Sequence, residues 1–218
     1  LIDTDATVGG SDGNRDYKGL WLAPDSDGSI VFGADGSDVS MATGDITLQA
    51  DTLQANDHTV SAVSSGSLVV ESVGTDFLGE TSTINIDATG DNFTSITLGK
   101  SGNTGELTSN AELTADGTFT AYGLLTLGDS ITTSGTQTYN GDVTIAGDSI
   151  TLSSMGSGGT GGAMTFTGNI DGAQANANDL VLLSGDQAIN VAGGVGSTVA
   201  LDRFELGTFG SAQTTVWD

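Results

Sequence analysis

The sequence contains no cysteine, one proline, one histidine and only four basic residues. The lack of cysteine excludes disulfide bridges, thiol catalysis and zinc sites built on cysteine. The four bases stand against 28 acidic residues and leave a net charge of -24; they are Arg15, Lys18, Lys100 and Arg203. Proteins that bind nucleic-acid phosphates or anionic membranes need a cluster of Lys and Arg, which four scattered bases cannot form. The composition therefore excludes nucleic acid as a partner.

Long apolar segments are also missing. The longest apolar stretches are as short as Leu180–Leu183, whereas a membrane-spanning helix needs about 18 apolar residues. We therefore predict no membrane insertion. The chain starts without an initiator methionine and without a basic region followed by an apolar core. We expect Leu1 to be a processed or excised N-terminus, with any secretion signal outside this sequence.

Glycine and aspartate are abundant instead. The 218 residues include 34 glycines, and most aspartates stand beside Gly, Ser or Asn. Aspartate favours turns, because its short side chain bonds to nearby backbone groups, whereas glutamate favours helices and is scarce in this chain. High net charge with much Gly and Ser also favours disorder. The regular supply of Ile, Val, Leu, Phe and Thr in short clusters argues against disorder.

Short runs with β-type residues recur along the chain, each bounded by Gly, Asp, Ser or Asn. They are Ile30-Val31-Phe32, Ile46-Thr47-Leu48, Leu68-Val69-Val70, Ile84-Asn85-Ile86, Ile96-Thr97-Leu98, Leu125-Thr126-Leu127, Val143-Thr144-Ile145, Ile150-Thr151-Leu152, Met164-Thr165-Phe166 and Phe204-Glu205-Leu206. No segment keeps a helical apolar period for three turns, so we predict almost no helix. The best helical candidate, residues 172–179, is rich in Ala and Asn and is more typical of a loop.

Two of these runs belong to an internal repeat. Residues 125–127 recur 18 residues later as residues 143–145, and residues 128–132 (GDSIT) recur 19 residues later as residues 147–151. Ala146 is then a one-residue insertion between the copies. Further strand centres lie about 16 to 21 residues apart, near Thr144, Thr165, Val181 and Ala200. A loose period near 20 with several short strands per repeat is typical of a chain that winds into stacked coils.

The sequence thus predicts an all-β fold, a right-handed parallel β-helix (β-solenoid) of short strands with coils of about 20 residues. Stacked coils pair each strand with its counterparts at about 4.8 Å and bury the apolar residues that one coil alone would leave exposed. A β-sandwich or tandem β-domains are the alternative. We expect residues 1–40 to form an acidic N-terminal cap or linking segment, continuous with a solenoid repeat region over residues 41–218. We also expect the chain to be a fragment of a larger protein.

Residues 130–206 also resemble a known repeat. The similarity rests on residues 131–144 (ITTSGTQTYNGDVT), residues 164–173 (MTFTGNIDGA), Gly193-Gly194-Val195-Gly196 and Val199-Ala200-Leu201. These segments are similar to repeats of large secreted bacterial proteins of the filamentous-haemagglutinin type. The resemblance implies a right-handed β-helix in a long exoprotein that serves adhesion, surface coating or matrix building and is exported through an outer-membrane partner. It places the chain outside the cell or on the bacterial cell surface.

Paired aspartates near the N-terminus are the candidate metal ligands. Asp25 and Asp27 lie on one turn, and Asp35 and Asp38 lie on the next. Such carboxylate pairs suit calcium, which prefers oxygen ligands, although the spacing does not match an EF-hand loop. The simpler interpretation is that these aspartates form Asx-turns and keep the surface soluble. Calcium binding by Asp25, Asp27, Asp35 and Asp38 is the alternative hypothesis.

Two further activities compete with a structural role. Polysaccharide lyases also use β-helices, but their chemistry needs a strong base near the sugar acid, and the four bases here are far apart in sequence. Outward Thr-x-Thr elements at residues 81–83, 118–120, 136–138 and 165–167 raise ice binding as a separate hypothesis. Their irregular spacing, and the general preference of threonine for strands, count against it.

We therefore expect a non-enzymatic, extracellular structural or adhesive β-solenoid segment of a bacterial surface protein. Its expected partners are copies of itself or neighbouring repeats, and cell-surface glycans. The alternative is a self-assembling filament, sheath or surface-layer subunit whose acidic contacts are bridged by calcium. A β-helix polysaccharide lyase or hydrolase is the remote alternative.

Overall fold

The computed structural model describes residues 19–22, 29–31, 39–41, 45–49, 52–54, 60–62, 66–72, 74, 76, 82–84, 93–156, 160–208 and 211–217. Regular secondary structure in these residues consists of strands alone, and residues 172–179 are not helical. No helix with the length and apolar character needed to cross a bilayer occurs in this described part. The all-β class predicted from the sequence is confirmed.

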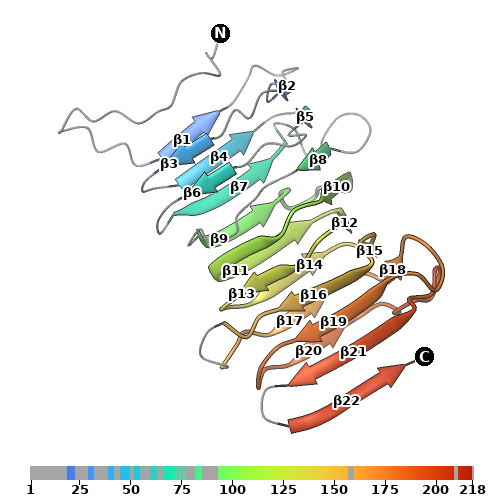
Figure 1. Ribbon diagram of the computed structural model, residues 1–218. Coiled ribbons are helices and arrows are strands. Elements are labelled where there is room, and N and C mark those ends of the chain that lie inside the picture. Colours follow the sequence, from blue (N-terminus) through green and yellow to red (C-terminus); the bar gives the residue numbers. More distant parts are fainter. Residues whose placement is uncertain are drawn as a thin grey trace.

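Most strands lie in three stacks that run along the molecule (Figure 1). The first stack contains β1 (Gly19–Leu22), β4 (Asp45–Gln49), β7 (Ser67–Glu71), β9 (Phe93–Leu98), the second half of β11 (Leu113–Tyr122), β14 (Gln137–Asn140), β17 (Met164–Phe166) and β20 (Ile189–Val191). The second stack contains β8 (Ser82–Ile84), β10 (Glu106–Ser109), β12 (Leu124–Leu127), β15 (Val143–Ile145) and β18 (Ile170–Gly172). The third stack contains the first half of β11, β13 (Ile131–Thr133), β16 (Ser149–Ser153), β19 (Asp179–Leu183), β21 (Arg203–Thr208) and β22 (Ser211–Trp217). Two further pairs join β2 (Ser29–Val31) to β5 (Thr52–Gln54) and β3 (Val39–Met41) to β6 (Val60–Ala62).

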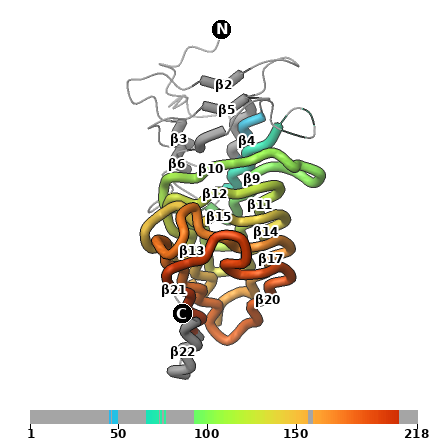
Figure 2. The backbone as a smooth tube through the Cα atoms, turned by 90° about the vertical axis from the view of Figure 1, so that its right-hand side faces the viewer, coloured from blue at the N-terminus to red at the C-terminus, as the bar shows by residue number. Residues whose placement is uncertain are grey.

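The chain visits the three stacks in a repeated order. From β11 onward it passes from the third stack to the first and then to the second, and it keeps this order through β18, β19 and β20. Figure 2 shows the successive turns of the backbone lying one beneath the other. Neighbouring strands pair in parallel, and among the described pairs only β21 and β22 are antiparallel. These long parallel sheets are compatible with a solenoid.

The internal repeat seen in the sequence is reproduced in only one of its two parts. Leu125 pairs with Val143, as the first part predicts, and the backbone N of Ala146 and of Gly147 both donate to the Leu127 carbonyl, which accommodates the extra residue. The second part predicts that Ile131 pairs with Ile150, but its partner is Leu152. The difference is two residues, and because side chains alternate with period two, both Ile150 and Leu152 are buried.

The wider spacing of strand centres does not measure one coil. Thr144, Thr165 and Val181 belong to β15, β17 and β19, which lie in three different stacks, and Ala200 lies in no strand. Their separation therefore spans two successive stack-to-stack steps, from β15 past β16 to β17 and from β17 past β18 to β19, and not one full coil. Coil length varies. Phe119, Gln137 and Met164 are successive partners on the first stack, so one coil there spans 18 residues and the next spans 27.

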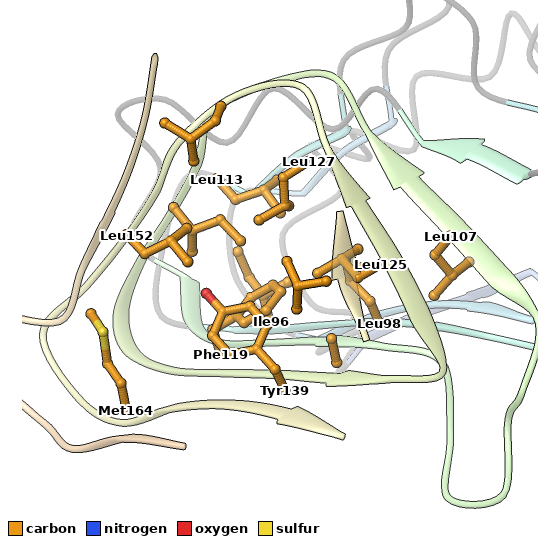
Figure 3. Packing of buried hydrophobic residues seen from close by; sticks show 14 of the residues in the cluster. Ile96, Leu98, Leu107, Leu113, Phe119, Leu125, Leu127, Tyr139, Leu152 and Met164 are labelled. Carbon is orange, nitrogen blue, oxygen red and sulfur yellow. The ribbon is translucent and has the colours of Figure 1, made fainter. Parts of the chain in front are cut away.

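The inward side chains fill one continuous core (Figure 3). Alternate residues are buried in strands such as β7, β14 and β19. Behind the first stack, three aromatic rings follow one another: the Phe119 and Tyr139 centroids are 5.4 Å apart, and Tyr139 stacks on Phe166 at 4.4 Å and 4°. The buried Tyr139 hydroxyl donates to Gln137 Oε1 at 2.8 Å, and Gln137 Nε2 donates to the Ser153 carbonyl at 2.9 Å. The polar groups inside this core are thus paired, as burial requires.

Candidate binding surface

Aspartates at the corners of the stacks join successive coils. The Asp45 carboxylate accepts hydrogen bonds from the Ser67 backbone N and Oγ, both at 2.7 Å. Asp142 Oδ1 accepts one from the Asn169 backbone N at 2.7 Å. The same arrangement joins Asp76 to Thr104 and Gly105, and Asp171 to Thr198 and Val199. Each acceptor lies one coil before its donor, so these acids contribute to stacking as well as to solubility.

These bonds change the acidity of two carboxyl groups. The Ser67 backbone N–H and then its hydroxyl hold the pKa of Asp45 below its ordinary value of 3.8. The Thr104 backbone N–H does the same for the pKa of Asp76. Both bonds favour the charged carboxylate. Their contribution to stability is therefore present above pH 3.8 and is lost as the pH falls from 3.8 through the lower pKa of the folded state.

We expect an Asp45→Asn substitution to reduce stability more at neutral pH than at a pH well below 3.8, where the native carboxyl is itself protonated. The difference in unfolding free energy should stay below about 1 kcal/mol, because Asp45 is exposed and solvent screens its charge. Urea unfolding at both pH values measures it. Asp116→Asn, at an exposed carboxylate inside β11, is the matched control. An equal pH response of the two variants would contradict the assignment.

The aspartates predicted to bind calcium, Asp25, Asp27, Asp35 and Asp38, lie outside the described residues. The calcium hypothesis therefore stays a prediction. Within the described part of the chain, no three His, Cys, Asp or Glu side chains come together in a way that could hold a metal ion.

Two of the four bases lie in the described part, at different places in the fold. Lys100 follows β9 of the first stack, and its Nζ donates to the Ser72 carbonyl at 2.8 Å. Arg203 begins β21 of the third stack and forms an ion pair with Glu205. Both cations thus interact with groups of their own chain. Arg15 and Lys18 lie outside the described residues.

Threonine and serine side chains line up on the outer side of the first stack. Its central row has one residue from each of β9, β11, β14 and β17, in register: Thr97, Thr120, Thr138 and Thr165. A second row lies two residues earlier along the chain. In it Ser95 pairs with Thr118, and Thr136 stands directly before Gln137, which is the partner of Phe119. We call these seven residues the hydroxyl face. Thr118 and Thr136 are exposed, and the other five are half-buried.

Two properties distinguish the hydroxyl face. The strand segments that carry it are residues 93–98, 118–122, 137–140 and 164–166. They contain no charged residue, although the chain carries 28 acids. Its seven side-chain hydroxyls also make no hydrogen bond to any described group of the chain. They are therefore free to bond to something outside the chain.

The second stack carries a threonine row of different character. Thr108, Thr126 and Thr144 are successive partners there, and the row continues to Asp171. The Thr126 hydroxyl donates to Glu106 Oε1 at 2.9 Å. Charged residues therefore stand within and beside this row, and one of its hydroxyls is already hydrogen-bonded to a group of the chain.

The threonine elements noted in the sequence divide between these stacks. Residues 118–120, 136–138 and 165–167 lie on the first stack, and residues 82–83 lie in β8 of the second. Their irregular spacing in the sequence hides the alignment, because the corners between strands differ in length. The threonine alignment is found by comparing the outward positions of paired strands, and not by looking for a fixed interval in the sequence.

In comparisons with known proteins, no protein-family model, curated protein or solved structure matches the chain. The function proposed for this chain therefore rests on the arrangement of its own residues.

Proposed function

We propose that the chain is a non-enzymatic, extracellular segment of a bacterial surface protein and that it serves as an adhesive or structural rod. One observation carries this proposal: three parallel stacks continue over successive coils around a single core, and outward side chains of the same kind align from coil to coil. Such a stack is stiff, because each coil is hydrogen-bonded to the coils on both sides. It repeats the same surface chemistry along its length, which suits many weak contacts with another surface.

The resemblance of residues 130–206 to filamentous-haemagglutinin repeats supports the same proposal. It suggests a secreted or cell-surface location and a right-handed parallel β-helix as the detailed form of the solenoid. Neighbouring repeats of the same protein and cell-surface glycans are the partners that this role would involve.

A surface-attachment assay tests the proposed function. Beads coated with the folded chain should bind to cell layers or to a glycan array about tenfold better than beads coated with a non-repetitive protein of equal negative charge, because aligned contacts add through avidity. The charge-matched protein controls for nonspecific adsorption. Attachment no better than that control, together with cleavage of acidic polysaccharides in the presence of calcium, would contradict the proposal and support an enzyme.

Self-assembly is a second candidate, because the core is less well covered at one end. Among the residues whose burial is described, the partly buried apolar side chains packed against the core come from the last coil: Ile189, Val191, Val195, Leu201 and Leu206. In the first stack β20 pairs with β17 alone, so one of its edges has no partner among the described strands. Free strand edges promote pairing with another chain. Homogeneous fibres in micrographs of the same preparation would favour a filament or sheath, and a monomer that attaches would favour an adhesin.

A further inference from the structure

The hydroxyl face is a two-dimensional array. Between coils its rows repeat at the strand spacing of about 4.8 Å, and along each strand the two rows are separated by two residues, or about 6.6 Å. The central row extends over four successive strands of the first stack, β9, β11, β14 and β17, and the second row, Ser95, Thr118 and Thr136, lies beside the first three. Both repeat distances are similar in size to distances between oxygen atoms on the faces of hexagonal ice.

The array is also rigid. Threonine is branched at Cβ, so its χ1 angle is restricted and its hydroxyl and methyl groups have fixed directions. The backbone beneath is held by the parallel pairing of β11, β14 and β17. Behind it lie the packed rings of Phe119, Tyr139 and Phe166. A ligand that binds to this surface therefore orders few side chains, which lowers the entropic cost of binding.

The chemistry of the face limits what it can bind. The segments that carry it, residues 93–98, 118–122, 137–140 and 164–166, contain no charged residue, on a chain whose net charge is -24. A charged partner would gain nothing there, since recognition of charge relies on complementary charge. The hydroxyls can donate and accept hydrogen bonds, and each threonine also carries a methyl group beside its hydroxyl. Such a face suits an uncharged partner with its own regular hydrogen-bonding groups.

We propose that the hydroxyl face binds ice. Its rows hold water molecules at positions that continue into the crystal, so that ordered water joins the protein to the ice surface. A crystalline polysaccharide is the closest competitor, but sugar rings pack best on aromatic rings. The hydroxyl face has none, and Tyr122 lies beyond its central row, at the end of β11. This activity goes beyond the attachment role proposed above and does not depend on it.

Thermal hysteresis and enrichment of the protein in slowly grown ice test the proposal. The native chain should separate the freezing and melting temperatures and should enter the ice. A Thr138→Tyr substitution in the central row should reduce the temperature gap by about fivefold or more, because its ring holds the surface away from the crystal. Thr118→Tyr is a second variant at an exposed position, where the ring disturbs no packing.

The matched control is Thr144→Tyr. Thr144 is half-buried like Thr138 and occupies an outward threonine row, but it lies in β15 of the second stack. This control should keep the gap within about twofold of the native value. Circular dichroism melting confirms that each variant folds.

Three results would overturn the proposal. The native chain could show neither a temperature gap nor enrichment in ice. Thr144→Tyr could lose as much activity as Thr138→Tyr. The native chain could instead bind to microcrystalline cellulose or chitin and stay excluded from ice, which would assign the face to a polysaccharide. Failure of the bead assay would leave the result of the ice experiment unchanged, so the two proposals fail separately.

Discussion

A Phe166→Ala substitution is expected to lower the free energy of unfolding by about 3–5 kcal/mol, the cost of removing a large aromatic side chain from a packed core. Phe166 is buried in β17 with a fractional exposure of 1%, and its ring stacks on Tyr139 at 4.4 Å. The substitution removes this contact and leaves a cavity between coils. The loss leaves Tyr139 with a single ring contact, to Phe119, whose ring is tilted and 5.4 Å away.

Urea unfolding followed by circular dichroism measures this effect. Thr165→Ala is the matched control, because Thr165 is the half-buried outward neighbour of Phe166 on the same strand. We expect it to change the unfolding free energy by no more than about 0.5 kcal/mol. Similar losses in the two variants would show that the inward and outward sides of β17 are not assigned correctly.

A Gly123→Ala substitution is expected to cost about 2–4 kcal/mol, through backbone strain and overpacking together. Gly123 joins β11 to β12 with a φ of 91°, which side chains other than glycine rarely adopt. A Cβ there would lie 2.5 Å from Asn103 Nδ2 and 2.6 Å from the Gly105 carbonyl oxygen. Asn103 would have to move, although its Nδ2 donates to the Tyr122 carbonyl at 2.8 Å.

Two comparisons separate strain from overpacking in this prediction. Gly74→Ala is the control, since its Cβ would meet only the Asp76 carbonyl oxygen at 4.0 Å; we expect a change within about 1 kcal/mol. In a double-mutant cycle, Asn103→Ala should make Gly123→Ala less costly, because it removes the side chain that clashes. Strictly additive losses in urea unfolding would contradict the clash with Asn103 and leave backbone strain together with the contact to the Gly105 carbonyl oxygen.

The strands could be predicted because their signal is local. All ten β-type runs identified in the sequence overlap strands, from Ile30 in β2 to Phe204 in β21. The sequence does not reveal β11, because Asp116-Gly117 is typical of a turn. In the structure these two residues lie inside a continuous strand, where the pairing with β9 shifts register between Ala115 and Thr118 as the strand passes from the third stack to the first.

Strand pairing and the candidate surface were harder to predict, because both depend on the lengths of corners. Similar sequences do not have to be neighbours in the fold. Ile131 and Ile150 occupy the same place in the GDSIT repeat, yet Ile131 pairs with Leu152 and not with Ile150, whose partner is Leu180. The alignment of Thr97, Thr120, Thr138 and Thr165 depends on the pairing of their strands. The cross-coil bonds of Asp45 and Asp142 likewise need the register, whereas local turn preference indicates only that they lie at corners.

The uneven corners have a consequence for how such a chain can change length. Between β13 and β14 the corner is short, whereas between β16 and β17, one coil later, it is much longer, yet Gln137 still pairs with Met164 and Ile131 with Leu152. The additional residues therefore leave the strand pairing unchanged. Insertions and deletions at this corner are compatible with the fold, so an inserted peptide could be displayed there without rebuilding the core.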